Sequence, residues 1–340
     1  MFMNNLSYFS SLAILLTLTS CSSNDSQEIY THERKNEINV YDKVVGIKID
    51  PNSMVISGVP YVVGKYIVMQ DSNNPTHYLH VFDKSDFHHI KAILPKGHGP
   101  GELANLSSFV TPIKNTNELY LLANNHKFMR INVDSAIAKV IYKPEILHNF
   151  GKKAKLYGTN YCFINDSIAI TDLMEPTGNK GYNDYIGKFN IKTGEFQKFD
   201  YAHPKGSRKR IYVAASADNN VCAELYDTRD LITLYDLEGN FKCNIYGPDW
   251  TGDDKTHGKV YFHEGYYIKD KLLAAYSGMK WGNDDYPRKI FVYDLSGNYI
   301  KTLDFGGHQI NSFEYDEDNY RLILKTDEYE LAYLPLDGIL

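Results

Sequence analysis

The chain has 340 residues, of which 23% are charged, and its formal net charge of −6 arises from interspersed acidic and basic side chains. Without a basic stripe to face a phosphate backbone, this charge pattern argues against nucleic acid as a partner. The 28 tyrosines, together with Val, Ile and Phe, favour β-strands over helices.

The N-terminus has the organisation of an export signal. Residues 9–18 form an apolar run that is too short to span a bilayer and lies where a signal peptide has its hydrophobic region. Leu-Thr-Ser then precedes Cys21 and resembles a bacterial lipobox, whose cysteine receives diacylglycerol. Residues 1–20 carry no Lys or Arg, which departs from the usual signal, and a buried first helix is the alternative.

We therefore expect a signal peptide over 1–20, lipidation at Cys21, and an exported protein anchored to the outer membrane. The anchor would be its only membrane contact, with the protein facing the periplasm or the outside. Residues 22–36 are polar and predict a flexible tether, so the expected domains are a lipidated tether at 21–38 and one folded domain at 39–340.

Three further cysteines, Cys162, Cys222 and Cys243, include no CxxC pair and have no histidine at a ligand spacing. Cys162 and Cys222 lie in apolar strand patterns, which predicts buried thiols in preference to a metal cluster or a disulfide.

A short apolar strand recurs six times along the chain, at intervals of about 50 residues. The copies begin at Lys65, Glu118, Ser167, Asn220, Lys271 and Arg321. A second strand follows each copy and ends in a tight turn, most clearly at Gly239-Asn240 and Gly297-Asn298 and more weakly at 131–134. An upstream strand, such as 259–262, completes four strands per unit. This is the pattern of a propeller blade.

The predicted fold is therefore all-β: a six-bladed β-propeller of four-stranded antiparallel blades, with very little helix. The sixth unit ends after its third strand at 331–334, while an unpaired apolar segment at 43–49 precedes the first. We expect this N-terminal strand to become the outer strand of the last blade and close the ring. Since closure leaves no open edge, we expect a monomer.

Long, polar insertions predict a binding face. Blade strands alternate in direction, so the loops between second and third strands and the loops between blades open on one face. The long insertions fall there, at 71–77, 95–107, 143–155, 172–184, 203–210, 226–230, 247–257 and 277–288. Function concentrates on such loops, although exposed loops collect polar residues in any protein.

The most distinctive motif is Lys-Gly-His98-Gly-Pro-Gly-Glu102-Leu, between the first and second units. Its glycines and proline impose an unusual backbone path, and its free N–H groups could meet an anion flanked by His98 and Glu102. Alternatively, Glu102 caps these groups itself and the loop only turns a blade corner. The motif matches neither a phosphate loop nor a dinucleotide fingerprint.

The lipobox, the six units and this Gly-His-Gly-Pro-Gly-Glu stretch resemble the TolB-like six-bladed β-propeller lipoproteins of Bacteroidetes, which are similar to NHL-repeat propellers. The resemblance runs from Cys21 to the C-terminus and implies a propeller in the cell envelope. It implies no reaction and no catalytic residues.

The function favoured here is a non-catalytic binding module that takes an envelope protein, a peptide or a glycan on the loop-rich face, without a cofactor. Aromatic planes suit sugars, and aromatic side chains with arginines suit protein interfaces. The candidate ligand-binding residues are His98, Glu102, His126, Arg208, Arg210, Arg229, Trp250 and Trp281.

Two hypotheses of enzymatic function stay open. One is a metal-dependent hydrolase or lyase similar to gluconolactonase and paraoxonase propellers, holding Ca²⁺ at the central channel. Its candidate ligands recur after equivalent second strands, at Asp71, Asn125, Asp172, Asp227 and Asp327, where Asp and Asn also end strands for structural reasons. The other is a sugar-chain lyase with a His and Tyr acid–base pair, which linear spacing does not locate.

Overall fold

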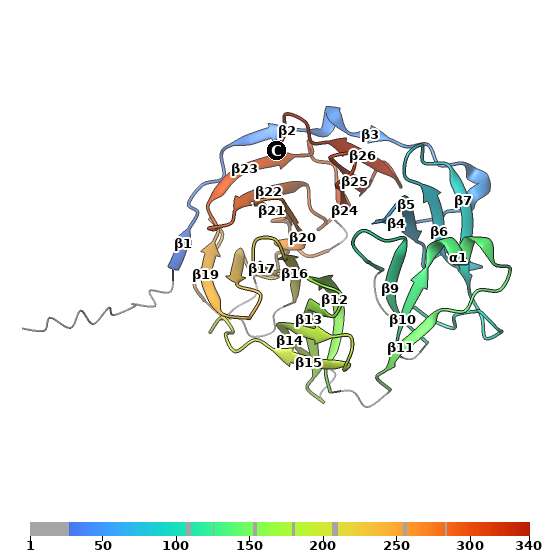
Figure 1. Ribbon diagram of the computed structural model, residues 1–340. Helices are drawn as coiled ribbons and strands as arrows, with labels where there is room; N and C mark the ends of the chain where they lie inside the picture. The colour runs from blue at the N-terminus through green and yellow to red at the C-terminus, as the bar shows by residue number, and fades with distance from the viewer. Residues whose placement is uncertain are drawn as a thin grey trace, which may run out of the picture.

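The computed structural model describes residues 27–106, 110–124, 126–151, 155–178, 181–205, 210–253, 257–282 and 284–340. Six antiparallel sheets stand around a central axis, as the six-bladed prediction requires (Figure 1). All six repeated strands found in the sequence are the second strands of these blades. The predicted lipidation site, Cys21, and the predicted signal peptide lie outside the described residues.

The blades follow one another in chain order, and their first strands contact each other around the axis. From the inner to the outer strand they are β4 (Val59–Val63), β5 (Tyr66–Gln70), β6 (His77–Asp83) and β7 (His89–Pro95) in blade 1; β8 (Thr111–Pro112), β9 (Glu118–Ala123), β10 (Lys127–Asn132) and β11 (Glu145–Asn149) in blade 2; β12 (Tyr157–Phe163), β13 (Ile168–Pro176), β14 (Tyr182–Asn190) and β15 (Glu195–Lys198) in blade 3; β16 (Ile211–Ser216), β17 (Val221–Tyr226), β18 (Leu231–Tyr235) and β19 (Phe241–Tyr246) in blade 4; β20 (Phe262–Ile268), β21 (Lys271–Tyr276), β22 (Lys289–Asp294) and β23 (Tyr299–Asp304) in blade 5; and β24 (Ile310–Asp316), β25 (Arg321–Thr326) and β26 (Ala332–Pro335) in blade 6.

The N-terminal segment closes the ring as predicted. Strand β3 (Val45–Gly46) pairs antiparallel with β26 and becomes the fourth strand of blade 6. The closing strand is shorter than the predicted 43–49 because η1 (Tyr41–Lys43) precedes it and Ile47 leaves the ladder with one further bond, from its N–H to the carbonyl of Leu331.

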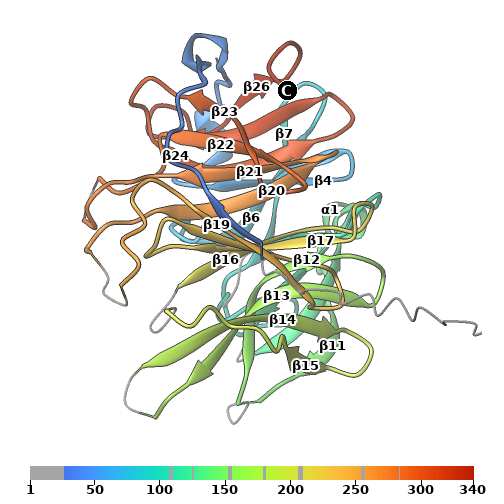
Figure 2. The same cartoon turned by 90° about the vertical axis from the view of Figure 1, so that its left-hand side faces the viewer.

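The chain ahead of β3 is not the free tether that the sequence predicts for residues up to 38. Strand β1 (Gln27–Tyr30) adds a parallel fifth strand to β19 of blade 4, and β2 (Glu37–Asn39) does the same to β23 of blade 5. Residues 27–46, here called the N-terminal belt, thus run outside blades 4, 5 and 6 in turn, and the blue segment crosses the blade edges in Figure 2. Backbone pairing with exposed outer strands explains how so polar a segment is held.

The core consists of apolar layers between neighbouring blades. Separate clusters fill the spaces between blades 1 and 2, 2 and 3, 3 and 4, 4 and 5, 5 and 6, and 6 and 1. Cys222 is buried within them, as predicted, and so is Cys243, whereas Cys162, also predicted to be buried, is only partly buried and packs against them; all three thiols are free. Burial raises the pKa of Cys162 to about 12 and that of Cys243 to about 11, so these thiols are poor nucleophiles.

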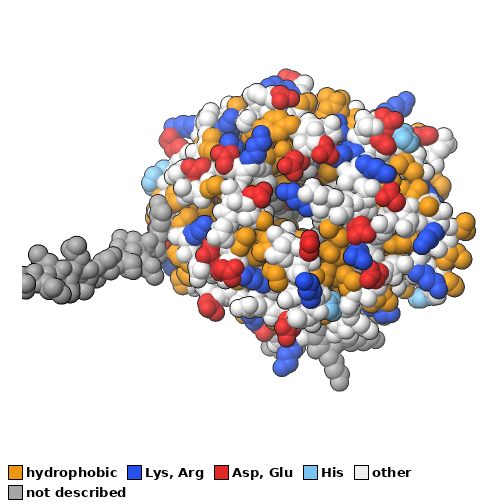
Figure 3. Space-filling view, in the orientation of Figure 1, with side chains coloured by type: hydrophobic (Ala, Val, Ile, Leu, Met, Phe, Trp, Pro, Cys, Tyr) orange, Lys and Arg blue, Asp and Glu red, His pale blue; other side chains and the backbone are white. Residues whose placement is uncertain are grey.

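The two faces of the ring differ as predicted. One, the tight-turn face, carries the connections between first and second and between third and fourth strands; Gly239 (φ 94°) and Gly297 (φ 88°) form its two clearest turns. In blade 2 the expected turn after β10 is instead helix α1 (Val133–Ala138), because the side chain of Asn132 accepts the N–H of Ser135 and caps a helix. Figure 3 views this face, where acidic and basic side chains are mixed.

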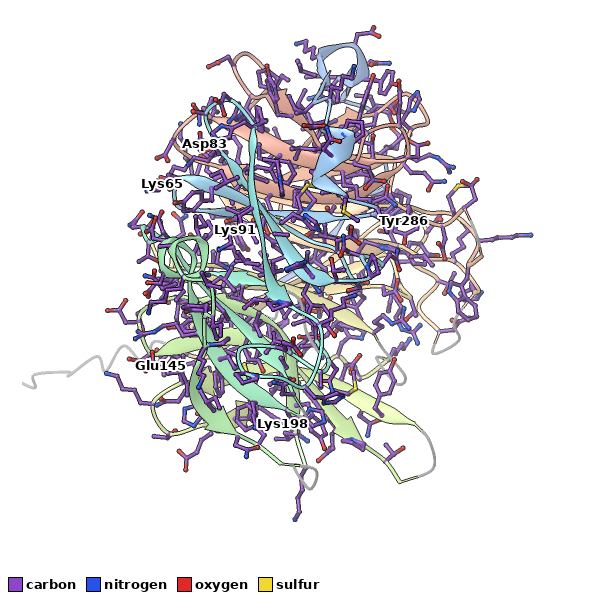
Figure 4. All side chains as sticks on the ribbon, turned by 90° about the vertical axis from the view of Figure 1, so that its right-hand side faces the viewer. Lys65, Asp83, Lys91, Glu145, Lys198 and Tyr286 are labelled. Carbon is purple, nitrogen blue, oxygen red and sulfur yellow. The ribbon has the colours of Figure 1, made fainter. Side chains whose placement is uncertain are left out.

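The opposite, loop-rich face carries the longer connections. In Figure 4 Tyr286 projects on this side, while Lys65 and Asp83 mark the tight-turn face. The inner strand of blade 5 begins at Phe262 and not at 259 as predicted, because residues 259–261 bond irregularly with 277–280. Within the described residues, the structure contains no helix of the length and apolarity needed to cross a membrane.

Candidate functional site

Three of the predicted metal ligands instead hold blade corners together. The carboxylate of Asp71 is fully buried and accepts four backbone N–H groups, from residues 56, 57, 73 and 74, at 2.7–3.2 Å. Asp172 accepts the hydroxyl of Thr159 at 2.5 Å and the N–H of Asn160 at 2.7 Å, and Asp327 accepts the N–H of Gln309 at 3.1 Å.

Asp71 and Asp327 directly follow second strands and bond backbone N–H groups just ahead of the first strand of their own blade, whereas Asp172 lies within β13 and bonds residues 159 and 160 at the bulge of β12. Asn125 lies outside the described residues, but its neighbour Asn124 makes the equivalent bond, accepting the N–H of Ala104 at 2.7 Å. The recurrence that suggested a metal ring is therefore accounted for by local capping. The described residues hold no group of three or more His, Cys, Asp or Glu side chains arranged to bind a metal.

Asp227 is the exception among the five positions. Its carboxylate is nearly buried, and its described cationic neighbour is Arg210, whose Nη1 lies 3.7 Å away. Burial raises the pKa of Asp227 to about 6; Arg210 lowers it and Asp285 adds to the rise. A carboxyl group whose pKa is raised towards neutrality by burial and by a specific charged neighbour is typical of functional sites.

A histidine and two tyrosines lie beside this pair. His263 stacks on Tyr212, with ring centroids 5.9 Å apart and an angle of 13° between the ring planes. The centroid of the Tyr286 ring lies 5.7 Å from that of His263. Burial lowers the pKa of His263, so the imidazole is neutral at pH 7, and its buried Nε2 has no hydrogen-bond partner among the described residues. Arg210, Tyr212, Asp227, His263 and Tyr286 are called the mouth cluster below.

The fold places the mouth cluster on the loop-rich face, where the inner strands of blades 4 and 5 begin. Arg210 immediately precedes inner strand β16, Tyr212 is its second residue, and His263 is the second residue of inner strand β20. Asp227 and Tyr286 come from the loops that follow the second strands of blades 4 and 5. None but Arg210 and Asp227 was a predicted site residue.

Two carboxyl groups lie deeper along the inner strands. Glu264 follows His263 on β20 and accepts the N–H of Phe313 at 3.0 Å, next to Glu314 on β24. Burial raises the pKa of Glu264 to about 8, and burial together with Glu264 raises that of Glu314 well above its usual range. This pair therefore retains a proton at pH 7, as two interacting carboxyls commonly do.

The glycine-rich loop supplies its own anion. Oε2 of Glu102 accepts the N–H of Gly99 at 2.8 Å, and the N–H of Gly97 bonds the carbonyl of Leu103. A Cβ at Gly97 would lie 2.0 Å from the Glu102 carboxylate, which explains the glycine there. His98 is exposed. Glu102 therefore caps the backbone N–H group of its own loop, which was the alternative to an anion site. Among the described residues, no hydrogen bond or ion pair joins this loop to the mouth cluster.

The two tryptophans predicted to bind ligand differ in their exposure to solvent. Trp281 is 77% exposed, whereas Trp250 is half-buried against Tyr246 and His203, at 4.8 and 5.4 Å between ring centroids. A hollow of about 360 Å³ adjoins Trp250 and is lined by residues that include His257, Lys259 and Tyr261.

Arg229 is buried and donates to the carbonyl of Asp253 at 3.2 Å, so it supports a loop and presents no exposed charge. His126 contacts Tyr157 in blade 3, 5.0 Å between centroids, away from the mouth cluster in blades 4 and 5. Arg208 lies outside the described residues.

Fold and comparisons agree on the class of protein: the chain is a six-bladed β-propeller. A family model described as a 6-bladed beta-propeller, DUF5128, matches residues 50–148. No curated protein sequence matches the chain.

Solved structures show the same fold at low sequence identity. The chain is 11% identical to a member of the DUF4221 family from Bacteroides vulgatus, with a TM-score of 0.56 over 85% of this chain and 96% of that one. A luciferin-regenerating enzyme is also 11% identical, with a TM-score of 0.51 over 85% and 94%. The calcium-binding protein regucalcin from Agrobacterium tumefaciens has a TM-score of 0.49 at 11% identity over 90% and 94%. These likenesses concern the fold alone.

Proposed function

We propose that the protein is a non-catalytic binding module of the bacterial cell envelope that takes a glycan, peptide or protein ligand at the mouth cluster. It would belong with TolB-like propeller lipoproteins, act as a monomer, and be held to the outer membrane by a lipid on Cys21. The observation that carries the proposal is that Tyr212, His263 and Tyr286 lie beside a charged pair whose carboxylate is buried and whose guanidinium is about half exposed. The exposed Trp281 lies on the same loop as Tyr286.

The aromatic side chains come from separate loops. Trp281 and Tyr286 lie on the blade 5 loop with the exposed Met279, and Tyr182 begins β14 in blade 3. Burial lowers the pKa of Arg210, but the side chains of Tyr182 and Asp227 raise it, and the net shift is upwards; Tyr182 of blade 3 therefore lies beside this guanidinium. Exposed aromatic planes beside an arginine and a carboxylate favour sugar rings or peptide side chains with polar groups.

The test is a thermal-shift and direct-binding screen of the soluble protein from Ser22 against glycans, muropeptides and peptides. A ligand found in this way should lose at least tenfold in affinity with Trp281→Ala or Tyr286→Ala, because each removes an exposed contact plane. Val140→Ala is the control, since Val140 is fully exposed after helix α1 on the opposite face. Unchanged binding by both aromatic variants would exclude the mouth cluster as the site.

A second candidate function is a hydrolase or lyase at the same place. It is favoured by Asp227, with a pKa of about 6, lying near the neutral His263 and two tyrosines. A carboxylate titrating near neutral pH can take a proton as a general base, and Arg210 can pair with an acidic substrate group.

Metal analysis of the purified protein separates this candidate from the Ca²⁺-dependent version. Turnover that follows a pH profile near 6 and is abolished in Asp227→Asn, without stoichiometric metal, would support acid–base chemistry. Stoichiometric Ca²⁺ that Asp227→Asn removes would support the metal-dependent hydrolase.

A further inference from the structure

We propose that the lipid anchor orients the propeller, with the tight-turn face towards the bilayer and the mouth cluster turned away from it. The inference rests on the proposed lipidation of Cys21. It concerns which surface a soluble partner can reach, and it follows from the direction in which the N-terminal belt joins the ring.

The belt enters from the tight-turn side. Strand β1 runs parallel to β19, with Gln27 opposite Cys243 and Tyr30 opposite Tyr246. Strand β19 itself runs from the tight turn at 236–240 to the loop at 247–261. Gln27 is therefore the end of the belt nearer the tight-turn face, and the chain then moves towards the loop-rich face.

Contacts that follow β1 hold the belt in place. The N–H of Thr31 continues the ladder to the carbonyl of Tyr246, at 2.8 Å. Three residues later, Arg34 forms two hydrogen bonds with the buried carboxylate of Asp230, at 2.7 and 3.0 Å. Its guanidinium also lies over the ring of Phe291 in blade 5, at 4.2 Å. These contacts hold the belt against blades 4 and 5.

Five residues, 22–26, separate Cys21 from Gln27. Fully extended, this stretch spans only about 20 Å, at roughly 3.3–3.6 Å per residue. To lay the loop-rich face on a bilayer, it would have to run back along β19 and past the loops that project beyond Tyr246. From Gln27, opposite Cys243, three residues of β19 remain before its end at Tyr246, about 10 Å at roughly 3.4 Å each, so a reversed tether would use about half of its length before it reached those loops. A tether leaving from the tight-turn side without reversal places that face nearest the lipid.

The test uses the full chain, expressed with its leader and reconstituted in vesicles that contain a headgroup-labelled acceptor lipid. Two variants with one added cysteine each, Ser72→Cys and Ser85→Cys, place it in blade 1 on the loop-rich and the tight-turn face, and both positions are exposed. Each carries a donor dye. The native thiols at 222 and 243 are buried and that at 162 has a raised pKa, so labelling is selective.

Energy transfer to the lipid should be at least twofold greater from position 85 than from position 72. Insertion of twenty Gly and Ser residues after Ser22 should abolish the difference, because a long flexible tether no longer orients the ring. Equal transfer from the two positions with the native tether, or greater transfer from 72, would overturn the inference. A chain that is never recovered with the membrane would instead contradict the proposed anchoring, a separate failure that cell fractionation detects.

Discussion

Arg34 of the N-terminal belt and Asp230 of blade 4 form a two-pronged ion pair, with side chains 8% and 0% exposed. Nη1 and Nη2 donate to the two carboxylate oxygens at 3.0 and 2.7 Å, and Asp230 also accepts the N–H of Asp249. The pair joins residues 196 positions apart and fastens the chain start to the ring. Such forked geometry is specific to arginine.

We expect Arg34→Ala to lower the free energy of unfolding by about 3–5 kcal/mol, because Asp230 would be left buried without its counter-charge. Urea denaturation of the protein from Ser22 measures the loss. The control is Arg130→Ala, which removes an exposed pair with Glu145 and should cost less than about 1 kcal/mol. Equal losses in the two variants would show that the belt contributes little to stability.

The blade-corner role of Asp71 predicts a structural effect. Asp71→Ala should cost about 3 kcal/mol or more, because four N–H groups lose a buried acceptor, and Asp71→Asn should cost less because one oxygen remains. Asp327→Ala, at an exposed corner with one described backbone bond, should cost about 1 kcal/mol. If Asp71→Ala changed ligand or metal binding while stability was preserved, the corner assignment would be wrong.

Ionisation of Asp227 should lower the free energy of unfolding as the pH rises. Its pKa in the fold, about 6, lies above the ordinary value of 3.8, so the folded state resists its ionisation. The fold therefore loses roughly 3 kcal/mol between about pH 4 and pH 6, at about 1.4 kcal/mol per pKa unit. Asp227→Asn should be more stable than the native protein at pH 7 and nearly equal to it at pH 4, while ligand binding weakens. Thermal unfolding at both pH values tests this, and a destabilised variant at pH 7 would contradict it.

His80 gives the opposite pH dependence. It is 1% exposed on β6, its ring nitrogens have no hydrogen-bond partner among the described residues, and burial lowers its pKa from 6.5 to about 4, with the nearby His89 adding to the shift. The folded state holds His80 neutral, so its free energy of unfolding is unaffected by this residue above about pH 6.5. As the pH falls from there towards 4, protonation of His80 in the unfolded state lowers that free energy by roughly 3 kcal/mol. His80→Leu should flatten the decline between these values, whereas the exposed control His98→Leu should not. An unchanged slope in His80→Leu would contradict the assignment.

The ring architecture could be predicted because each second strand is an apolar run that recurs at a steady interval, and because Gly239 and Gly297 form turns that need positive φ. The belt could not, since β1 and β2 are polar sequences that gain their structure from pairing with outer strands. Helix α1 was missed because Asn132 caps a helix as readily as it starts a turn.

The mouth cluster was only partly predictable. Arg210 and Asp227 were singled out from the loops, but Tyr212 and His263 lie on inner strands of different blades and meet only when the ring closes. Both are the second residue of an inner strand, so aligning the weaker upstream strands of the repeat would have paired them. The opposite error concerns the predicted metal ligands. A carboxylate that recurs in each blade can have a structural role in that blade, as the backbone hydrogen bonds of Asp71, Asp172 and Asp327 show.

Binding of a ligand at the mouth cluster on the loop-rich face is the central proposal for this protein. Hydrogen–deuterium exchange of the protein from Ser22, with and without the strongest ligand from the screen, tests it most directly. We expect protection in loop 277–288 and at 210–212, with no change in turns 236–240 and 295–298 on the opposite face. Protection confined to those turns or to the outer strands, with the mouth loops unaffected, would contradict it.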